Sequence, residues 1–248
     1  MHPLDNIIWQ ALTTRQAAFA ETFESAKRFI REVTSLTALP DYSEQDYQSL
    51  AGLVGPGGTT GLFLEAPFQP RPGWKLIAGA PMLEMVYEHG TTPAASEIEW
   101  QELGADASPE MVELATLTKP GPFGTRTHEL GTYLGIRREG KLVAMAGERL
   151  KIPGYTEVSA VCTHPDHTGN GYAQALMNEV MRRILDRGET PLLHVREDNH
   201  RAVRIYERLG FRTRVLMHFA VIRRDAAPME DQLPASTIAS PAASGTAG

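Results

Sequence analysis

The sequence predicts a mixed α/β (α+β) fold, and three observations support this. Between about residues 108 and 224, segments with helical periodicity alternate with strand-like segments. A chain of 248 residues that is 42% hydrophobic can bury one large core or two small ones. The end of the chain is rich in Ala, Pro, Ser and Gly, so it cannot offset the entropy of ordering. We therefore predict an α/β region over 1–105, a larger domain over 106–225 and a disordered tail over 226–248.

Charge and composition narrow the function classes. The chain has 24 Lys and Arg against 30 Asp and Glu, a net charge of −6, so no basic surplus is available for nucleic acid. A single cysteine excludes an intrachain disulfide and suits a reducing compartment. Residues 1–30 do not have the pattern of a signal peptide, and no apolar run approaches the roughly 20 residues that span a bilayer. We expect a cytoplasmic protein without a membrane or nucleic-acid partner.

The N-terminal region is expected to be the smaller α/β unit. Helical patterns cover residues 5–21 and 43–55, and a strand is predicted over 59–66. The glycines of "GPGGTT" lie between the second helix and this strand, where a helix stop and a turn are a better interpretation than phosphate binding. The polar segment 89–97 is expected to separate this region from the rest.

The following elements are predicted in order along the larger domain. A helix opens at Ser108, a possible N-cap, and stops at Pro120. Two β-prone runs around Glu139 and Gly140 predict a hairpin. A third strand covers residues 155–165 and ends at a proline.

A second helix is predicted from Tyr172 to Arg187, because apolar residues recur there at helical spacing. A short buried strand follows at 191–195. The next helix lies within 198–211, with Asp198 or Asn199 as its cap and Gly210 as its stop, and a last strand covers 214–224.

The segment "HPDHTGNGYA", residues 164–173, joins the third strand to the second helix. A helix start flanked by glycines exposes backbone N–H groups that favour phosphate, and glycine lets a ligand approach closely. A dinucleotide fingerprint is disfavoured, because Gln174 fills its third glycine position and "HPDHT" separates the strand from Gly169. A tight turn that binds no ligand is the other alternative.

This segment together with "NHRAVRIYERLGF", residues 199–211, resembles the GNAT superfamily of acyl-CoA N-acyltransferases, with a C-terminal domain like that of the glycine N-acyltransferases. Thr168 stands where that family usually has Gln or Arg, while Gly171 and Ala173 match its phosphate motif. The resemblance covers about residues 105–224. It implies a GNAT fold, a mixed and mostly antiparallel sheet with a splayed central strand flanked by helices.

The resemblance implies that acetyl-CoA is the cosubstrate. Its diphosphate would bind the N–H groups of Thr168, Gly169, Asn170, Gly171, Tyr172 and Ala173, and its pantetheine arm the backbone of Val161, Cys162 and Thr163. Asn199 would either contact the pantetheine region or only cap its helix. From strand alternation we also expect Val158, Ala160 and Cys162 to share one small apolar face, with Glu157, Ser159, Val161 and Thr163 on the other.

Two side chains are candidates for the chemistry that the resemblance implies. Tyr206 occupies the family's usual position for stabilising the departing thiolate, and hydrogen bonding is expected rather than full proton donation. The alternative is a tyrosine packed in the core. Glu157 is the candidate general base, with an ordinary solvated strand glutamate as its alternative. Cys162, His164 and His167 offer only three zinc ligands, so no metal site is expected.

The expected activity is direct transfer of an acetyl group from acetyl-CoA to a primary amine of a small molecule or peptide. The alternative is a non-catalytic module that binds acyl-CoA as a sensor or docks a partner. The acceptor should be framed by the loop over 118–131, by the end of the last strand and by the N-terminal region. One hypothesis is that this region is a degenerate second copy of the same fold.

Overall fold

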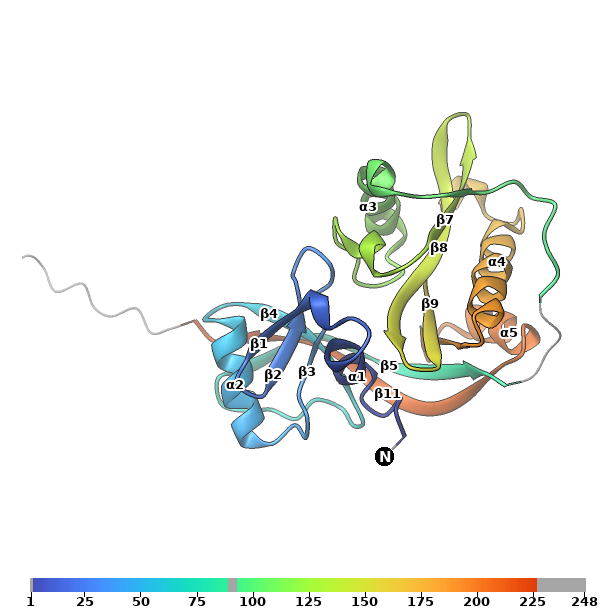
Figure 1. Ribbon diagram of the computed structural model, residues 1–248. Helices are drawn as coiled ribbons and strands as arrows, with labels where there is room; N and C mark the ends of the chain where they lie inside the picture. Colours follow the sequence, from blue (N-terminus) through green and yellow to red (C-terminus); the bar gives the residue numbers. More distant parts are fainter. Residues whose placement is uncertain (1, 89–92, 227–248) are drawn as a thin grey trace, which may run out of the picture.

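The computed structural model describes residues 2–88 and 93–226 and is shown in Figure 1. The predicted tail lies outside the described residues except for Ala226, as does part of the predicted separator over 89–97. The α-helices are α1 (Ile7–Thr13), α2 (Glu44–Val54), α3 (Ser108–Thr118), α4 (Tyr172–Asp186) and α5 (His200–Arg208). The strands are β1 (Ala20–Phe23), β2 (Ala26–Phe29), β3 (Thr37–Ala38), β4 (Thr59–Leu64), β5 (Trp74–Tyr87), β6 (Gln101–Glu102), β7 (Tyr133–Arg138), β8 (Lys141–Ile152), β9 (Tyr155–Thr163), β10 (Thr190–Arg196) and β11 (Phe211–Arg224).

The strands form a small and a large sheet. The small sheet has the order β1-β2-β3, and the large one has the order β4-β11-β5-β10-β9-β8-β7-β6. In the large sheet β9 and β10 pair in parallel, and the other neighbours pair antiparallel. Helix α4 packs against β8 and β9. The mixed, mostly antiparallel sheet flanked by helices confirms the predicted fold class.

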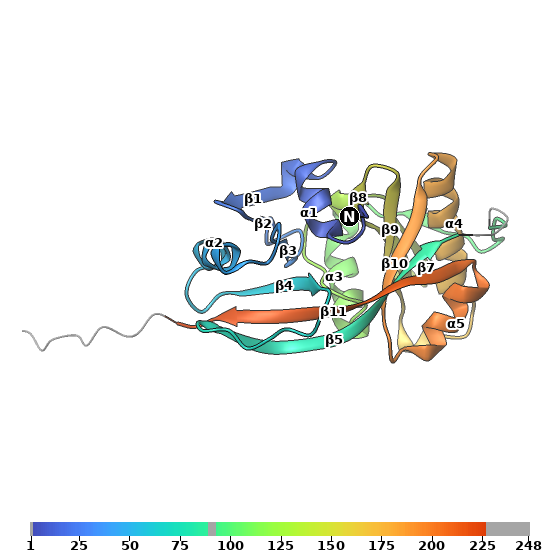
Figure 2. The ribbon, with the colours of Figure 1, turned by 90° about the horizontal axis from the view of Figure 1, so that it is seen from below.

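The long strand β5 was missed by the sequence analysis. It lies between β10 and β11, and its register with β11 runs from Trp74 opposite Arg224 to Tyr87 opposite Phe211. Figure 2 shows the two strands side by side along the molecule. Gly79 and Pro81 weaken the strand signal here, so tertiary pairing decides the conformation. The large sheet thus contains strands from before and after residue 105. The predicted boundary between an N-terminal region and a larger domain at this residue stays a prediction.

The two parts of the chain share one strand order. In the first, three antiparallel strands (β1, β2, β3) are followed by α2, by β4 and by the long β5. In the second, three antiparallel strands (β7, β8, β9) are followed by α4, by β10 and, after α5, by the long β11. A parallel bridge between Leu36 and Gly61 joins β4 to the end of β2-β3, as β10 joins β9. Strand β5 pairs with β10, and β11 pairs with β4, so the last strand of each part lies beside a strand of the other part. The hypothesis of a degenerate second copy stays a prediction.

Several local predictions can be compared with the structure. The hairpin turn is confirmed, because Glu139 and Gly140 both have positive φ, 51° and 79°. The helix predicted over 5–21 is wrong in its second half: α1 ends at Thr13, and β1 begins at Ala20 because it pairs with β2. Ser108 is the first residue of α3 rather than its N-cap, and its hydroxyl donates to the Thr125 carbonyl.

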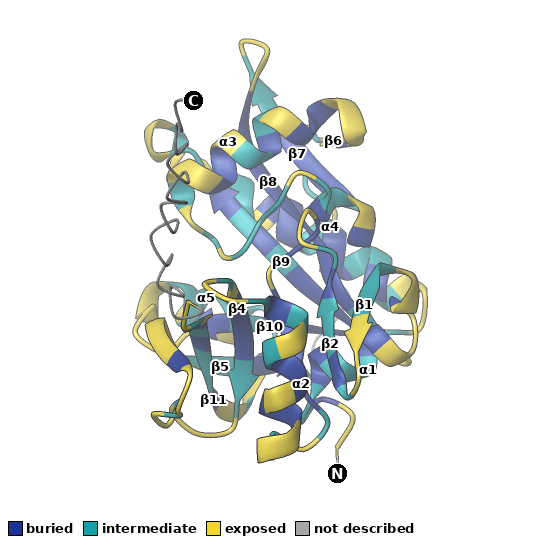
Figure 3. Cartoon of the chain, turned by 90° about the vertical axis from the view of Figure 1, so that its left-hand side faces the viewer, coloured by how far each residue is buried: buried dark blue, intermediate teal, exposed yellow. Residues whose placement is uncertain are grey.

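The largest hydrophobic core lies between the sheet and α4. It includes Leu176, Val180 and Met181 of the helix and Val158 of β9. Figure 3 shows β8 and β9 as mostly buried, whereas the helices turn exposed faces outward. A second core packs α1 against β8 and ties the beginning of the chain to the larger domain. The central strands of the large sheet therefore pack against α4 in one core and against α1 in another.

Candidate active site

The site begins where β9 separates from β10. The two strands pair only between residues 155–157 and 190–192, while β9 continues to pair with β8 through Cys162 and Thr163. Ala160 has φ +53°, and the register with β8 shifts around it, which marks a β-bulge. The splayed central strand is thus confirmed. Beyond Glu157, no strand of residues 2–88 and 93–226 pairs with the edge of β9 that faces β10.

The bulge also overturns the predicted alternation along β9. Val158 and Val161 pack against the core under α4, whereas Ala160 and Cys162 pack into the cluster under α3. The expectation that Val158, Ala160 and Cys162 share one face is therefore wrong, because the extra residue shifts the phase of the strand. Burial raises the pKa of the Cys162 thiol to about 11, so this cysteine is an unactivated core residue.

The start of α4 has no side-chain cap, so its first backbone N–H groups are not bound by a capping residue. Gly169 and Gly171 have φ +86° and +76°, and Gly171 is the N-cap without a side-chain hydrogen bond to the helix. The polar side chains of this loop bind back to its own carbonyls: Thr168 Oγ1 donates to Pro165 O at 3.1 Å, and Asn170 Nδ2 donates to His167 O at 2.9 Å. The first N–H groups of α4 are thus left for an outside acceptor.

A cation that the sequence motifs did not reveal lies beside this helix start. Arg138, at the end of β7, donates from Nε to the Tyr172 hydroxyl at 2.9 Å, and its guanidinium lies 4.8 Å from the centre of the Tyr172 ring. Strand β7 and α4 are far apart in sequence, so only the fold brings the two residues together. The positive charge adds to the partial charge of the helix end.

A cavity of about 240 Å³ opens at the gap between the strands. It is lined by β9 from Val158 to Val161, by β10 through His194, by Tyr206 of α5 and by the loop 119–122. Phe63 of β4 and Phe219 of β11 complete the wall. The structure therefore brings together Tyr206, the splayed strand, the predicted loop over 118–131, the last strand and the N-terminal region.

Tyr206 packs against the core under α4 and contributes to the cavity wall at the same time. Its ring meets Phe211 edge-on at 6.2 Å between centroids. Burial raises the pKa of the phenol to about 12. The hydroxyl therefore stays protonated around neutral pH and can donate a hydrogen bond.

Glu157 lies behind the cavity and is only 1% exposed. Its carboxylate accepts from Arg149 Nε at 2.8 Å and Nη2 at 2.6 Å, and from the Leu150 N–H at 3.2 Å. His194 Nδ1 lies 2.7 Å from Glu157 Oε1, the oxygen that also accepts from Arg149 Nη2. The interpretation as a solvated strand glutamate is therefore wrong. Burial acts to raise the pKa of Glu157, but Arg149 and His194 outweigh burial and hold the pKa well below its usual range.

The ion pairs continue from Glu157 to β10, β5 and β11. His194 Nε2 lies 3.3 Å from Glu84 Oε2 of β5, Glu84 pairs with Arg214 of β11, and Arg214 reaches Asp5 at 2.8 Å. Burial acts to lower the pKa of His194, but the two carboxylates outweigh burial and raise the pKa. Arg149 and Glu84 belong to no sequence motif. Only their pairing across the sheet reveals them.

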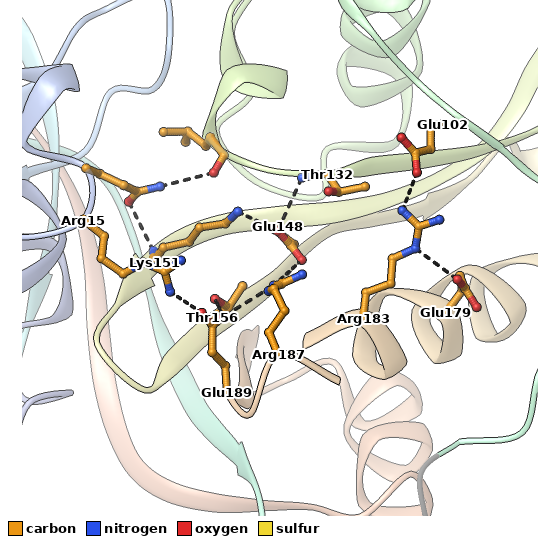
Figure 4. A network of polar contacts seen from close by, with 12 residues as sticks. Arg15, Glu102, Thr132, Glu148, Lys151, Thr156, Glu179, Arg183, Arg187 and Glu189 are labelled. Atoms are coloured by element: carbon orange, nitrogen blue, oxygen red, sulfur yellow. Dashed lines mark hydrogen bonds and ion pairs between the residues drawn. The ribbon is translucent and has the colours of Figure 1, made fainter. Parts of the chain in front are cut away.

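Other polar groups have structural roles. Asn199 caps α5 by accepting from the Ala202 N–H at 3.2 Å, so its contact with pantetheine stays a prediction. A second network, away from the cavity, surrounds the buried Glu148, which pairs with Lys151 and Arg187 at 2.7 Å each (Figure 4). Arg15 joins this network through Glu189 and ties the N-terminal segment to α4.

The described residues contain neither a metal-binding cluster nor a membrane-spanning helix. Residues 2–88 and 93–226 hold no group of three or more His, Cys, Asp or Glu side chains arranged to bind a metal ion. Within the same residues, none of the helices is both long and apolar enough to cross a membrane.

Comparison with known proteins adds to this geometry. The family model of FR47-like proteins matches residues 133–220. The crystal structure of an acetyltransferase of the GNAT family from Novosphingobium aromaticivorans is similar to this chain with a TM-score of 0.84 and 34% identity, over 91% of this chain and 100% of the other. A mycothiol acetyltransferase from Streptomyces avermitilis is 28% identical over 61% of this chain.

An acetyltransferase from Yersinia pestis is 39% identical over 51 residues, 20% of this chain. The matched segments span 36% of the Yersinia protein and 51% of the Streptomyces protein, so the chain corresponds to about a third to a half of these curated relatives. The Novosphingobium structure is matched over its whole length. The chain belongs to the GNAT family of acyltransferases.

Proposed function

We propose that this protein transfers an acetyl group from acetyl-CoA directly to an amine. One observation carries the proposal: Tyr206 and the part of β9 that does not pair with β10 line one cavity at the gap in the sheet, and β9 leads from there into the uncapped start of α4. A strand edge suits the amide groups of pantetheine, and a helix start suits a diphosphate. The tyrosine then lies where the thioester of the bound cosubstrate would end.

The diphosphate is assigned to the N–H groups of residues 168–173. Gly169 and Gly171 allow close approach, since a Cβ at Gly169 would meet nothing within 4 Å and one at Gly171 only Ile98 at 3.9 Å. Arg138 lies beside this helix start and provides a full positive charge. We propose that this arginine compensates for Thr168, which stands where the family usually has Gln or Arg.

The pantetheine arm is assigned to the backbone of Val161, Cys162 and Thr163, on the edge that does not pair with β10. A backbone N–H of this edge can donate to the thioester oxygen as negative charge develops on it. Tyr206 can donate to the sulfur as the thiolate leaves. With a pKa of about 12 the phenol favours a hydrogen bond over complete proton transfer.

The amine must lose a proton before it attacks, and Glu157 was the predicted base. Its ion pair argues against direct proton abstraction, because a carboxylate with so low a pKa is a weak base and does not line the cavity. We propose that Glu157 instead positions Arg149 and His194. The positive side chains at the cavity disfavour an ammonium ion, so the ammonium group would lose its proton to water before binding and the amine would bind in its neutral form.

The test is release of free thiol from acetyl-CoA in the presence of a panel of amines, amino acids and peptides. We expect Tyr206→Phe to lower kcat on the order of 100-fold with an unchanged Kd for acetyl-CoA. Tyr155→Phe is the matched control, because Tyr155 lies at the paired end of β9. A wild-type rate in Tyr206→Phe would remove the role of the phenol. Tight binding without turnover of any acceptor would instead support the non-catalytic module.

A further inference from the structure

The charged side chains that line the cavity are all cationic, namely Lys119, Arg149, His194 and Arg196, and no carboxylate lines it among the described residues. From this arrangement, and resting on the proposed acetyl transfer, we infer that the acceptor is a small amine that also carries an anionic oxyacid group. Lys119 and the free nitrogen of Arg149 are the residues that would bind this group. A carboxylate and a phosphate present the same chemistry to them.

Arg149 is held so that one donor nitrogen remains available. Its Nε and Nη2 donate to Glu157, which keeps the guanidinium plane fixed. The remaining Nη1 lies on the side of the loop 119–122, since a Cβ at Gly121 would be 3.7 Å from it. A buried guanidinium that is already oriented loses little entropy when it binds an anion. This nitrogen therefore provides a rigid donor at the cavity.

Lys119 faces the same cavity from the end of α3. It is exposed, adopts φ +51°, and makes no ion pair with the described residues. Pro120 and Pro122 restrict the loop that carries it. The other two cations are occupied: Arg196 is paired with both oxygens of Asp198, and both ring nitrogens of His194 face carboxylates. Among the described residues that line this cavity, Lys119 is thus the cation without a carboxylate partner.

The size of the cavity limits the acceptor. A volume of about 240 Å³ is below the roughly 300–1,000 Å³ of pockets that hold drug-sized ligands. The same space must also admit the acetyl group. Phe63 and Phe219 close the cavity with apolar surface from the N-terminal part and the last strand. The acceptor is therefore a compact molecule with its amine and its anionic group close together.

The experiment compares acceptors that share the skeleton H₂N–CH₂–CH₂–X: β-alanine, O-phosphoethanolamine, ethanolamine and ethylenediamine. We expect kcat/KM, corrected for the fraction of free amine, to be at least about tenfold higher for an anionic member than for ethanolamine, which corresponds to about 1.4 kcal/mol. Ethylenediamine should be the poorest acceptor. The ratio of β-alanine to O-phosphoethanolamine distinguishes a carboxylate from a phosphate.

The charge-reversal variant Lys119→Glu makes the test specific. We expect it to raise KM for the anionic acceptor at least tenfold with a smaller change in kcat, and to improve ethylenediamine. Lys141→Glu, at an exposed lysine of the hairpin, should leave the order unchanged. Equal use of all four amines, or an unaltered order in Lys119→Glu, would overturn the inference while the acetyl transfer stands. Failure of the proposed function is distinct, because thiol release would then be absent with every amine of the wider panel.

Discussion

The two parts of the molecule share a strand order, but the helices after their third strands begin in different ways. Helix α2 begins with a capping box, in which Ser43 accepts from the Asp46 N–H and Asp46 accepts from the Ser43 N–H at 3.1 Å. Helix α4 begins at Gly171 with no side-chain cap. One helix start is closed by its own side chains, and the other is open.

The carboxylate of Asp46 also accepts from Ser25 and from the Asp41 N–H. Burial acts to raise its pKa, but these hydrogen bonds outweigh burial and lower the pKa, so a fixed negative charge occupies the start of α2. A phosphate would be repelled there. The comparison teaches that one architecture can carry a helix start with a side-chain cap, as at α2, and one without, as at α4.

The largest expected effect concerns the buried ion pair of the second part. Glu157→Gln leaves the Arg149 charge without its partner, and we expect the free energy of unfolding to fall by about 3–5 kcal/mol. Asp46→Asn in the first part should cost about 1–2 kcal/mol, because it weakens a cap and its hydrogen bonds. Urea denaturation measures both. An equal loss of unfolding free energy in the two variants would contradict the larger contribution expected of the buried ion pair of Glu157.

A matched pair of glycines separates ligand binding from folding. Gly171 and Gly55, at the end of α2, both have φ +76°, but ψ is 4° at Gly171 and 164° at Gly55, so replacement by Ala strains the backbone at least as much at Gly55. We expect only Gly171→Ala to weaken acetyl-CoA binding, by roughly tenfold or about 1.4 kcal/mol. Isothermal titration calorimetry and thermal unfolding of both variants provide the comparison. The same loss of affinity in Gly55→Ala would argue for a general effect of destabilisation.

The raised pKa of His194 predicts that the free energy of unfolding depends on pH. A group whose pKa is higher in the folded state stabilises the fold fully below its unfolded pKa, near 6.5, and this contribution is lost as pH rises through the folded pKa. The free energy of unfolding should therefore fall above pH 6.5. His194→Gln should remove this slope, and His200→Gln, at an exposed position, should retain it. Urea titrations between pH 6 and 9 measure it.

The smallest effect comes from copying the closed helix start onto the open one. Gln174 is the third residue of α4, as Asp46 is of α2, and it is exposed. Gln174→Asp should stabilise the protein by about 0.3–1 kcal/mol through the helix dipole and weaken acetyl-CoA binding severalfold. Gln174→Asn is the control, because it shortens the side chain as Asp does but adds no charge. Stronger binding of acetyl-CoA by the aspartate variant would contradict an anion site at α4.

Local sequence patterns were sufficient to predict the elements that depend mainly on residues close together in the sequence. Helical spacing predicted α4, and the pair Glu139-Gly140 predicted the hairpin, because both depend on neighbours in sequence. The glycine loop and the Tyr206 motif, together with the family resemblance, predicted the gap between β9 and β10. The same reasoning failed at Ala160, since a bulge depends on how β9 pairs with β8.

The sequence by itself determined the mixed fold, the open start of α4 and the placement of Tyr206 on a helix that follows a buried strand. Only the tertiary structure decided that β5 enters the centre of the sheet and that Glu157, Arg149, His194 and Glu84 meet behind the cavity. The physical reason is that helix starts and turns are set by neighbouring residues. The pairing of β4 with β11 joins Thr59 to Arg223, and the ion pair of Glu84 with Arg214 joins residues 130 positions apart. No local pattern identifies such partners.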